Sequence, residues 1–315
     1  MSIGIIFPGQ GSQSVGMMAE LAAEFPQVGE TFAEASTELG YDLWEVVQSG
    51  PVERLNSTDV TQPAMLAAGV ATWRVWQAEG GASPAVMAGH SLGEYTALVC
   101  AGALAFSDGV RLVAERGRLM QAAVPAGEGA MAAILGLDDD TVRRVCAEAA
   151  QGEVASAVNF NSPGQVVVAG HAGAVDRAVA LAKEAGAKRA VVLPVSVPSH
   201  CALMSEAAEQ LAKRLRDVVF QAPAVPVINN VDVASPASAD AVRDALARQL
   251  HQPVRWVEVI QAMAARGVDR VIECGPGKVL VGLNKRIDKT MSVQAVFDPA
   301  SLQEALASAA ATATA

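Results

Sequence analysis

The sequence is poor in basic residues and in aromatic residues. Its 315 residues include 23 Lys and Arg against 33 Asp and Glu, a formal net charge of −10, and only 4% are aromatic. Because nucleic acid is bound by a basic face, this charge balance argues against a nucleic-acid partner. An acidic protein partner would have to dock on a local basic patch, against the overall field of the protein.

Cysteine pairs and long apolar runs are also missing. Cys100, Cys146, Cys201 and Cys274 are far apart and form no C-x-x-C pair, which is typical of reduced thiols in a cytoplasmic protein rather than of a zinc site or a disulfide framework. No run of about 18 apolar residues occurs, so we predict no membrane span. The first apolar run, residues 3–7, has no basic region before it, which indicates a buried strand and no signal peptide.

What the sequence contains instead is the stretch Gly89-His90-Ser91-Leu92-Gly93. It follows an apolar run at 84–88 and precedes an Ala-rich segment at 97–104. Strand, G-x-S-x-G, helix is the context of a nucleophile elbow, a sharp turn from which a serine oxygen projects into a cleft. The alternative is a Gly-rich connector whose serine only caps the next helix. In the first interpretation Ser91 is the candidate nucleophile.

A serine nucleophile needs a base, which is usually a histidine. Elimination favours His200, which follows a segment with two prolines, residues 194–198. The other three histidines lie inside the elbow, at a helix start and near a helix end: His90, His171 and His251. No Asp between Ser91 and His200 stands out at a strand end, where the usual hydrolase order puts the third group. A backbone carbonyl suffices to hold the imidazole tautomer, and the residues alone leave open which carbonyl does so.

The turn after the first predicted strand, Gly9-Gln10-Gly11-Ser12-Gln13-Ser14, is rich in glycine. A dinucleotide fingerprint would need Gly where Ser14 stands, and no G-K-[ST] motif occurs, so we expect no cofactor site. Serine acyl-transfer sites take one oxyanion donor from the N–H after the nucleophile, here Leu92, and the second from a loop after an earlier strand. Gln10 is the candidate for the second N–H.

Residues 129–194 indicate strand, helix, strand, strand, helix, strand, the βαββαβ order of a ferredoxin-like unit. Segments that contain proline flank this unit on both sides. We therefore predict an α/β fold with two lobes. A large α/β-hydrolase-like lobe with a mostly parallel sheet comprises residues 1–125 and 197–315, and an inserted small ferredoxin-like lobe comprises residues 126–196. A cleft between two lobes is a favoured place for a ligand.

Two further predictions concern helices. Thr61-Gln62-Pro63 should start a long apolar helix over 64–79, in which Trp73 and Trp76 are core residues rather than ligand contacts. The last residues, 305–315, are almost only Ala, Thr and Ser, and we expect them to be frayed.

Seven motifs stand in order along the chain. They are Phe7-Pro8-Gly9-Gln10-Gly11-Ser12-Gln13, Thr61-Gln62-Pro63-Ala64, Gly89-His90-Ser91-Leu92-Gly93-Glu94-Tyr95, Arg116-Gly117, Asn159-Phe160-Asn161-Ser162-Pro163-Gly164-Gln165, Val197-Pro198-Ser199-His200 and Gly275-Pro276-Gly277. Each is weak alone, but together they resemble the bacterial malonyl-CoA:acyl carrier protein transacylases, from Ile3 to about Phe297. The two-lobe prediction agrees with this resemblance.

The resemblance implies an acyltransferase of fatty-acid biosynthesis that needs no cofactor, since malonyl-CoA is a substrate. Ser91 would accept malonyl, with His200 as base. The N–H groups of Gln10 and Leu92 would hold the oxyanion. The acyl-enzyme would pass malonyl to the phosphopantetheine thiol of acyl carrier protein in ping-pong order. The resemblance also implies that the backbone carbonyl of Gln249, within Arg248-Gln249-Leu250, orients the histidine.

The resemblance further implies an acyl pocket. Arg116 would bind the free malonyl carboxylate with its two-pronged guanidinium. Met120, four residues on and so on the same helix face, and Gln62 would lie in the same pocket. From the residues alone, a solvated arginine and a core methionine are the alternatives. Val197-Pro198-Ser199 matches neither common pattern of relatives built into polyketide synthases, which disfavours methylmalonyl.

Four basic residues are candidate contacts for the acidic carrier protein: Lys188, Arg189, Lys285 and Arg286. Ordinary solvated charge is the alternative interpretation of all four.

Two other functions compete with acyl transfer. A serine hydrolase or thioesterase would use the same Ser-His pair but would not need Arg116. A non-catalytic protein that binds CoA or a carrier would have lost Ser91 or His200, and both are present.

Overall fold

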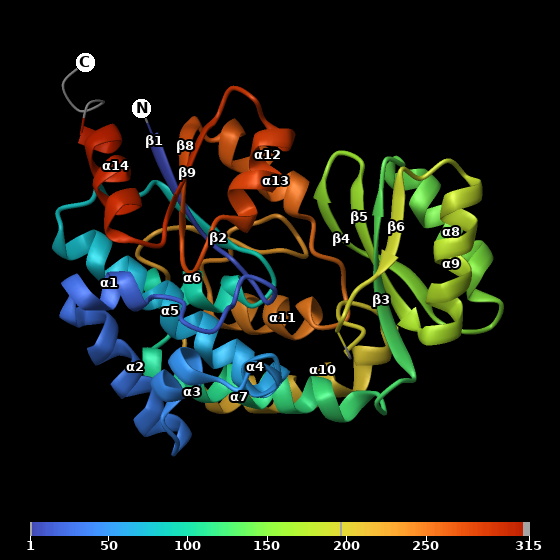
Figure 1. The fold of residues 1–315 in the computed structure, drawn as a ribbon, viewed down its shortest axis with the longest axis horizontal. Coiled ribbons are helices and arrows are strands. Elements are labelled where there is room, and N and C mark those ends of the chain that lie inside the picture. Colours follow the sequence, from blue (N-terminus) through green and yellow to red (C-terminus); the bar gives the residue numbers. More distant parts are fainter. Residues whose placement is uncertain (1, 196, 311–315) are drawn as a thin grey trace.

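Two β-sheets divide the protein into two lobes (Figure 1). One sheet is parallel, and the other is antiparallel and has helices on a single face. The computed structural model describes residues 2–195 and 197–310. Met1, Ser196 and residues 311–315 lie outside the described ranges, and with them the predicted lobe boundary at 196 and the end of the predicted frayed tail. The predicted fold class, a mostly parallel large sheet with an inserted ferredoxin-like unit, is confirmed.

The large sheet has five parallel strands in the order β7-β2-β1-β8-β9. Their bounds are Ser2–Phe7 for β1, Val86–Gly89 for β2, Val227–Ile228 for β7, Val268–Cys274 for β8 and Ser292–Val296 for β9. β1 is buried on both faces, because Ile5 and Phe7 pack into one core cluster and Ile6 into another. The carboxyl ends of parallel strands meet at one edge of a sheet, so the turns after β1, β2 and β7 come together there.

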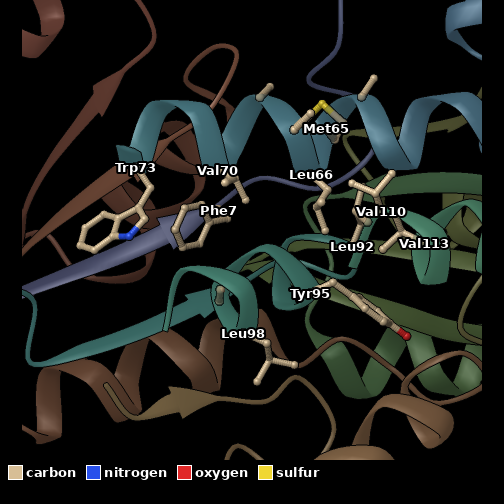
Figure 2. Packing of buried hydrophobic residues seen from close by; sticks show 14 of the residues in the cluster. Phe7, Met65, Leu66, Val70, Trp73, Leu92, Tyr95, Leu98, Val110 and Val113 are labelled. Atoms are coloured by element: carbon tan, nitrogen blue, oxygen red, sulfur yellow. The ribbon is translucent and has the colours of Figure 1, made fainter. Parts of the chain in front are cut away.

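Helices cover both faces of the large sheet. The face that carries Phe7 is covered by α5 (Thr58–Ala78), α6 (Gly93–Cys100) and α7 (Phe106–Ala123). Figure 2 shows Phe7 beside Val70 of α5, and Leu66 of α5 near Val110 of α7. The opposite face is covered by α12 (Trp256–Ala265) and α13 (Val279–Ile287), where Trp256 is fully buried.

The remaining elements of the large lobe lie around this core (Figure 1). They are α1 (Ala19–Glu24), α2 (Pro26–Leu39), α3 (Leu43–Ser49), α4 (Val52–Leu55), the 3₁₀ turn Ala202–Met204, α10 (Ser205–Asp217), α11 (Ala239–Gln249) and α14 (Pro299–Ala310).

The small sheet is antiparallel and has the order β4-β5-β3-β6. Its elements are β3 (Gly129–Leu135), α8 (Asp139–Ala150), β4 (Ala155–Ser162), β5 (Gln165–His171), α9 (Ala172–Glu184) and β6 (Arg189–Val192). The side chain of Asp138 caps α8 by accepting from the N–H of Thr141 at 2.8 Å. Both helices lie on the face of the small sheet that is turned away from the large lobe (Figure 1). The other face is left to the cleft between the lobes.

Backbone hydrogen bonds join the two lobes at β4. The N–H of Phe160 donates to the carbonyl of Val254 at 3.0 Å, and the N–H of Val254 donates to the carbonyl of Val158 at 2.8 Å. On the inner face of the small sheet, Met131 packs in one cluster with Cys201 of the large lobe. The lobes are therefore in contact, and the small sheet forms a wall beside the carboxyl edge of the large one.

The long helix α5 begins earlier than predicted. It starts at Thr58 and contains Pro63, which we expected to precede it. Tight packing explains the early start: a Cβ on Gly117 of α7 would lie only 2.6 Å from the Cα of Asp59 and 2.7 Å from the carbonyl oxygen of Thr58. Because proline has no backbone N–H, the helix lacks one hydrogen bond near its start. Contact with α7 keeps the first turn helical all the same.

The predicted frayed tail is wrong for residues 305–310. They belong to α14, and Leu302, Ala305 and Ala309 of that helix are buried. Alanine is the best helix former, and here each third or fourth residue meets the core of the large lobe.

Candidate active site

Ser91 lies on a strained turn between β2 and α6. Its φ of 51° falls in the left-handed region, which a residue other than glycine seldom adopts. The flanking glycines are required by close contacts. A Cβ on Gly89 would lie 1.9 Å from the carbonyl atoms of Gly93, and a Cβ on Gly93 would lie 2.1 Å from the carbonyl oxygen of Phe7. The strand–turn–helix geometry of an elbow is present, and β1 packs directly against it.

His200 meets Ser91 across a sequence separation of 109 residues. Ser91 Oγ is 2.8 Å from His200 Nε2, and His200 Nδ1 is 2.7 Å from the backbone carbonyl oxygen of Gln249. Because a carbonyl only accepts, the proton of the neutral ring sits on Nδ1, and the lone pair of Nε2 faces the serine hydroxyl. The backbone N–H of His200 donates to the carbonyl of Leu250 at 3.0 Å, so the ring and its backbone are both anchored at the end of α11.

The environment of His200 keeps its imidazole neutral. Burial, which is the largest cause, and the positive charge of Arg116 together lower its pKa to about 3, against the opposing effect of the hydrogen bond to Gln249. The side chain is 3% exposed. At neutral pH the ring is therefore in the form that accepts a proton.

The two predicted oxyanion donors, Leu92 and Gln10, both line the cavity beside Ser91. Neither backbone N–H has a hydrogen-bond acceptor within residues 2–195 and 197–310, whereas the N–H of Ser91 donates to Asn230 Oδ1 at 2.7 Å. Gly9 lets the two turns approach, since a Cβ there would lie 2.6 Å from the carbonyl oxygen of His90. Two unsatisfied N–H groups next to a serine hydroxyl could hold a developing oxyanion, as the sequence predicts.

Arg116 of α7 brings a positive charge to the same hydroxyl. Its Nη2 donates to Ser91 Oγ at 3.2 Å and to Gln249 Oε1 at 3.1 Å, and its Nη1 donates to Gln62 Oε1 at 2.8 Å. The side chain is 1% exposed, and burial lowers its pKa. All three acceptors are neutral, so the charge of the guanidinium has no directly bonded anion among them. Such a buried cation is costly and suits an incoming anion.

Gln62 and Met120 complete the surroundings of Arg116. Gln62 Nε2 is 3.2 Å from the sulfur of Met120, and both side chains are buried. Met120 lines the cavity, while Gln62 lies behind the guanidinium that it binds. The structure thus brings all eight predicted site residues to one place: Ser91, His200, Gln249, Gln10, Leu92, Arg116, Met120 and Gln62.

A cavity of about 290 Å³ opens in front of Ser91, between the two lobes. Its polar end is formed by the elbow, His200 and Arg116. Its other walls are largely apolar and come from the inner face of the small sheet, the segment after it and the start of α13: Met131, Ala133, Val167, Leu193, Val195, Val197, Val279, Leu280 and Leu283. An apolar channel with a few convergent polar groups is typical of a small-molecule site.

Two buried polar residues were missed by the sequence reasoning, Glu94 and Asn230. Asn230 Nδ2 donates to the carbonyl of Gly89 at 2.8 Å, and its backbone N–H donates to Glu94 Oε2 at 2.9 Å. Glu94 Oε2 also accepts from Gln249 Nε2 at 2.8 Å. A signal was present for both: Asn230 follows β7 as Ser91 follows β2, and Glu94 is the only charged residue in α6.

The other histidines have different partners. His90 Nε2 is 2.8 Å from Asn161 Oδ1 of β4, so it links the elbow to the small lobe. His171 accepts the N–H of Val154 at Nδ1, at the start of α9. His251 is only half-buried and does not line the cavity.

The four basic residues predicted to meet a carrier protein are all exposed: Lys188, Arg189, Lys285 and Arg286. Arg286 of α13 donates to Gln165 Oε1 at 2.7 Å, and Gln165 lines the cavity. This pair also crosses from the large lobe to the small one. Arg286 is therefore the one of these four residues that is hydrogen-bonded to a residue of the cavity wall.

Comparison with known families identifies the class. The family described as "Acyl transferase domain" matches residues 5–301. The chain belongs to this acyl transferase family, and it is an acyltransferase enzyme.

The names of individual relatives state a more specific activity than the description of the family does. The chain is 62% identical over 301 residues to the malonyl CoA-acyl carrier protein transacylase of Salmonella typhimurium, covering 96% of this chain and 97% of the relative. Among solved structures, an acyl carrier protein S-malonyltransferase from Vibrio cholerae matches with a TM-score of 0.94 at 62% identity, covering 96% of this chain and 99% of that one. A chain from a solved complex of a type II PKS acyl carrier protein with its malonyl-transacylase matches with a TM-score of 0.97 at 58% identity. The match covers 98% of this chain and 100% of that one.

Three further observations concern membranes, metals and thiols. None of the helices in the described ranges combines the length and hydropathy needed to cross a membrane. No group of three or more His, Cys, Asp or Glu side chains in those ranges is arranged to hold a metal ion. All four cysteines are free thiols.

The low pKa of His200 predicts an unusual pH profile. The rate at which a sulfonyl fluoride modifies Ser91 should stay nearly constant from about pH 8 down to about pH 5, because His200 stays unprotonated until the pH approaches its pKa of about 3. An ordinary histidine would lose its base form as the pH falls through about 6.5. The rate is measured by mass spectrometry, with Ser91→Ala as the unreactive control. A sigmoidal loss of rate centred near the ordinary histidine pKa would contradict this assignment.

Proposed function

We propose that this enzyme transfers the malonyl group of malonyl-CoA to the phosphopantetheine thiol of acyl carrier protein, through a malonyl ester on Ser91, and so supplies fatty-acid chain elongation. The observation that carries the proposal is Arg116 Nη2 at 3.2 Å from Ser91 Oγ. A nucleophile with a buried cation beside it suits an acyl group that ends in a carboxylate. The names of relatives at 62% identity support the same reaction.

In the first half-reaction His200 Nε2 takes the proton of Ser91 while Oγ forms a bond to the thioester carbonyl carbon. The carbonyl oxygen becomes an oxyanion and accepts from the N–H groups of Leu92 and Gln10. The tetrahedral intermediate then collapses, the C–S bond breaks, and the CoA sulfur leaves with the proton from His200. Throughout, the carbonyl of Gln249 accepts from Nδ1–H and stabilises the imidazolium.

The second half-reaction repeats these steps with the carrier thiol. His200 takes the thiol proton, the sulfur attacks the malonyl ester carbonyl, and the same two N–H groups hold the oxyanion. The C–O bond to Ser91 breaks, and Oγ leaves with the proton from His200. The enzyme returns to its starting state, and no oxidant, reductant or cofactor is required.

Arg116 selects the acyl group by binding its free carboxylate. Gln62 holds Nη1, and Met120 closes the wall beside it. A hydrogen bond to a charged group contributes roughly 1.5–3 kcal/mol. That corresponds to a preference of about ten- to more than a hundredfold for malonyl over acetyl. A general esterase has no need of this cation, so the hydrolase alternative is not favoured.

The location and the division of the chain complete the proposal. Free thiols fit a cytoplasmic enzyme.

We divide the chain into a large lobe of residues 1–125 and 197–315 and a small lobe of residues 126–196. The turn between α7 and β3 supports the first boundary.

Four basic residues are proposed to receive the acidic carrier protein. All four are exposed, on α13 and on β6 with the residue before it, while the chain as a whole carries a net charge of −10: Lys188, Arg189, Lys285 and Arg286. Local positive charge is what an acidic partner needs to dock against that field. A similar chain is known in complex with an acyl carrier protein, which supports this partner.

Direct acylation tests the proposed function. Mixed with malonyl-CoA, the enzyme should gain the mass of one malonyl group on Ser91, and addition of acyl carrier protein in its phosphopantetheine form should remove that mass and place it on the carrier. Intact-protein and peptide mass spectrometry measure both steps, with Ser91→Ala as control. The absence of an adduct, or its loss to water at the same rate with and without carrier protein, would overturn the proposal.

Replacement of Arg116 should change acyl selectivity. Arg116→Ala removes the cation that meets the malonyl carboxylate, so acylation by malonyl-CoA should fall by about ten- to more than a hundredfold relative to acylation by acetyl-CoA. A competition experiment with both thioesters measures the ratio of the two adducts. A ratio equal to that of the unaltered enzyme would refute the role of Arg116.

Charge reversal at the proposed basic contacts should weaken carrier binding. Lys188→Glu and Lys285→Glu should each raise the KM for acyl carrier protein several-fold, more at low salt than at high salt, because screening weakens exposed charge pairs. The KM for malonyl-CoA should stay constant. Lys213→Glu is the matched control, since it lies on α10, which packs against α7 and α11 rather than against β6 or α13. Equal effects of all three variants would show that these positions are ordinary solvated charge.

A further inference from the structure

Glu94 is a buried carboxylate that the acyl-transfer steps do not use. It lies in the first turn of α6, three residues after Ser91, and is 2% exposed. Burial raises its pKa to about 7, and hydrogen bonds from Gln249 and Asn230 oppose that shift. Burying a carboxylate costs free energy, because the charged group loses its contact with water.

The hydrogen bonds of Glu94 determine how the amide of Gln249 is turned. Gln249 Nε2 donates to Glu94 Oε2 at 2.8 Å and to the carbonyl of Ser91 at 3.0 Å. Its Oε1 is therefore left to accept from Arg116 Nη2 at 3.1 Å. A reversed amide would set its oxygen against the carboxylate and the Ser91 carbonyl, and its NH₂ against the guanidinium. All these contacts would be repulsive, so the acceptor oxygen of Glu94 and the carbonyl of Ser91 select one orientation.

The guanidinium of Arg116 is held in place by this amide. Its Nη2 is shared between Gln249 Oε1 and Ser91 Oγ, so loss of the first acceptor would free the group to turn away from the nucleophile. Tyr95, the neighbour of Glu94 in α6, supports it from the side, with its ring centroid 5.4 Å from Arg116 Cζ. Because the amide stands between the carboxylate and the guanidinium, Glu94 orders the cation without forming an ion pair that would occupy it.

We propose that Glu94 is a positioning residue for acyl selectivity: through the side chain of Gln249 it directs the Arg116 guanidinium at the acyl group on Ser91, and so favours acyl groups that end in a carboxylate. This inference rests on the proposed function. It assigns the side chain of Gln249 a task separate from that of its backbone carbonyl, which holds His200. Glu94 itself does not touch the reacting atoms.

The test compares two substitutions of Glu94 with a matched control. Glu94→Ala removes the acceptor of Gln249 Nε2, and Glu94→Gln keeps an oxygen there but adds a donor that permits the reversed amide. Glu273 is the control, since it is also a fully buried carboxylate with its pKa raised to about 7. Its hydrogen bonds go instead to the N–H groups of Leu280 and Val281 in α13.

The readout is the ratio of single-turnover acylation rates with malonyl-CoA and acetyl-CoA, in the full-length enzyme. Relative to the unaltered enzyme, the ratio should fall about tenfold in Glu94→Ala and about threefold in Glu94→Gln, since a charge-assisted hydrogen bond is lost or weakened. In Glu273→Gln the ratio should not change, even where the thermal midpoint falls. A purely structural role for Glu94 would lower both rates in parallel.

Each outcome decides between the two proposals. An unchanged ratio in Glu94→Gln, the variant that best preserves the fold, overturns the positioning role even if Glu94→Ala does not fold. An equal fall of the ratio in Glu273→Gln also overturns it, because the effect would then follow from lost stability. If the unaltered enzyme forms no malonyl adduct at all, the proposed function fails first, and this inference fails with it.

Discussion

The site depends on the hydrogen bond between His200 Nδ1 and the carbonyl of Gln249. A carboxylate in that position would raise the pKa of the ring by favouring imidazolium, whereas a carbonyl fixes the tautomer and leaves the ring neutral. Burial then keeps the pKa of His200 low, and Nε2 presents its lone pair to Ser91. Because Gln249 ends α11, the position of the base is set by the packing of a whole helix rather than by a mobile loop.

The same arrangement costs stability. Ser91 and His200 both have left-handed φ values, and Arg116, Glu94 and Gln249 are buried polar groups. Strained backbone and buried charge persist only where the surroundings hold them in place. Here the apolar residues of β1 pack on both faces of the large sheet, and Gln249 is hydrogen-bonded to both Arg116 and Glu94. The core thus carries a site that would be unstable by itself.

Local patterns in the sequence were sufficient for much of the fold. The βαββαβ order of the small lobe follows from strand-length apolar runs and from a cap such as Asp138, whose partners are three residues away. The elbow could be predicted because Gly89 and Gly93 are close in sequence as well as in space. The start of α5 could not be predicted, because close packing against Gly117 of α7 keeps that turn helical. The tail prediction failed because the composition of the tail does not show that Ala305 is buried in the core.

By itself, the sequence predicted Ser91 as the nucleophile, His200 as the favoured base, the two-lobe fold class and, through a family resemblance, the expected reaction. It left open which carbonyl orients the base, and the resemblance alone pointed to Gln249. Only the tertiary structure decided that Glu94, Asn230 and the side chain of Gln249 lie around the turn that carries Ser91. Their contacts join residues 133 to 158 positions apart, as from Gln249 to Arg116 and to Ser91. Such contacts leave no periodic pattern in a single chain, because they exist only where the carboxyl ends of strands and the end of α11 converge.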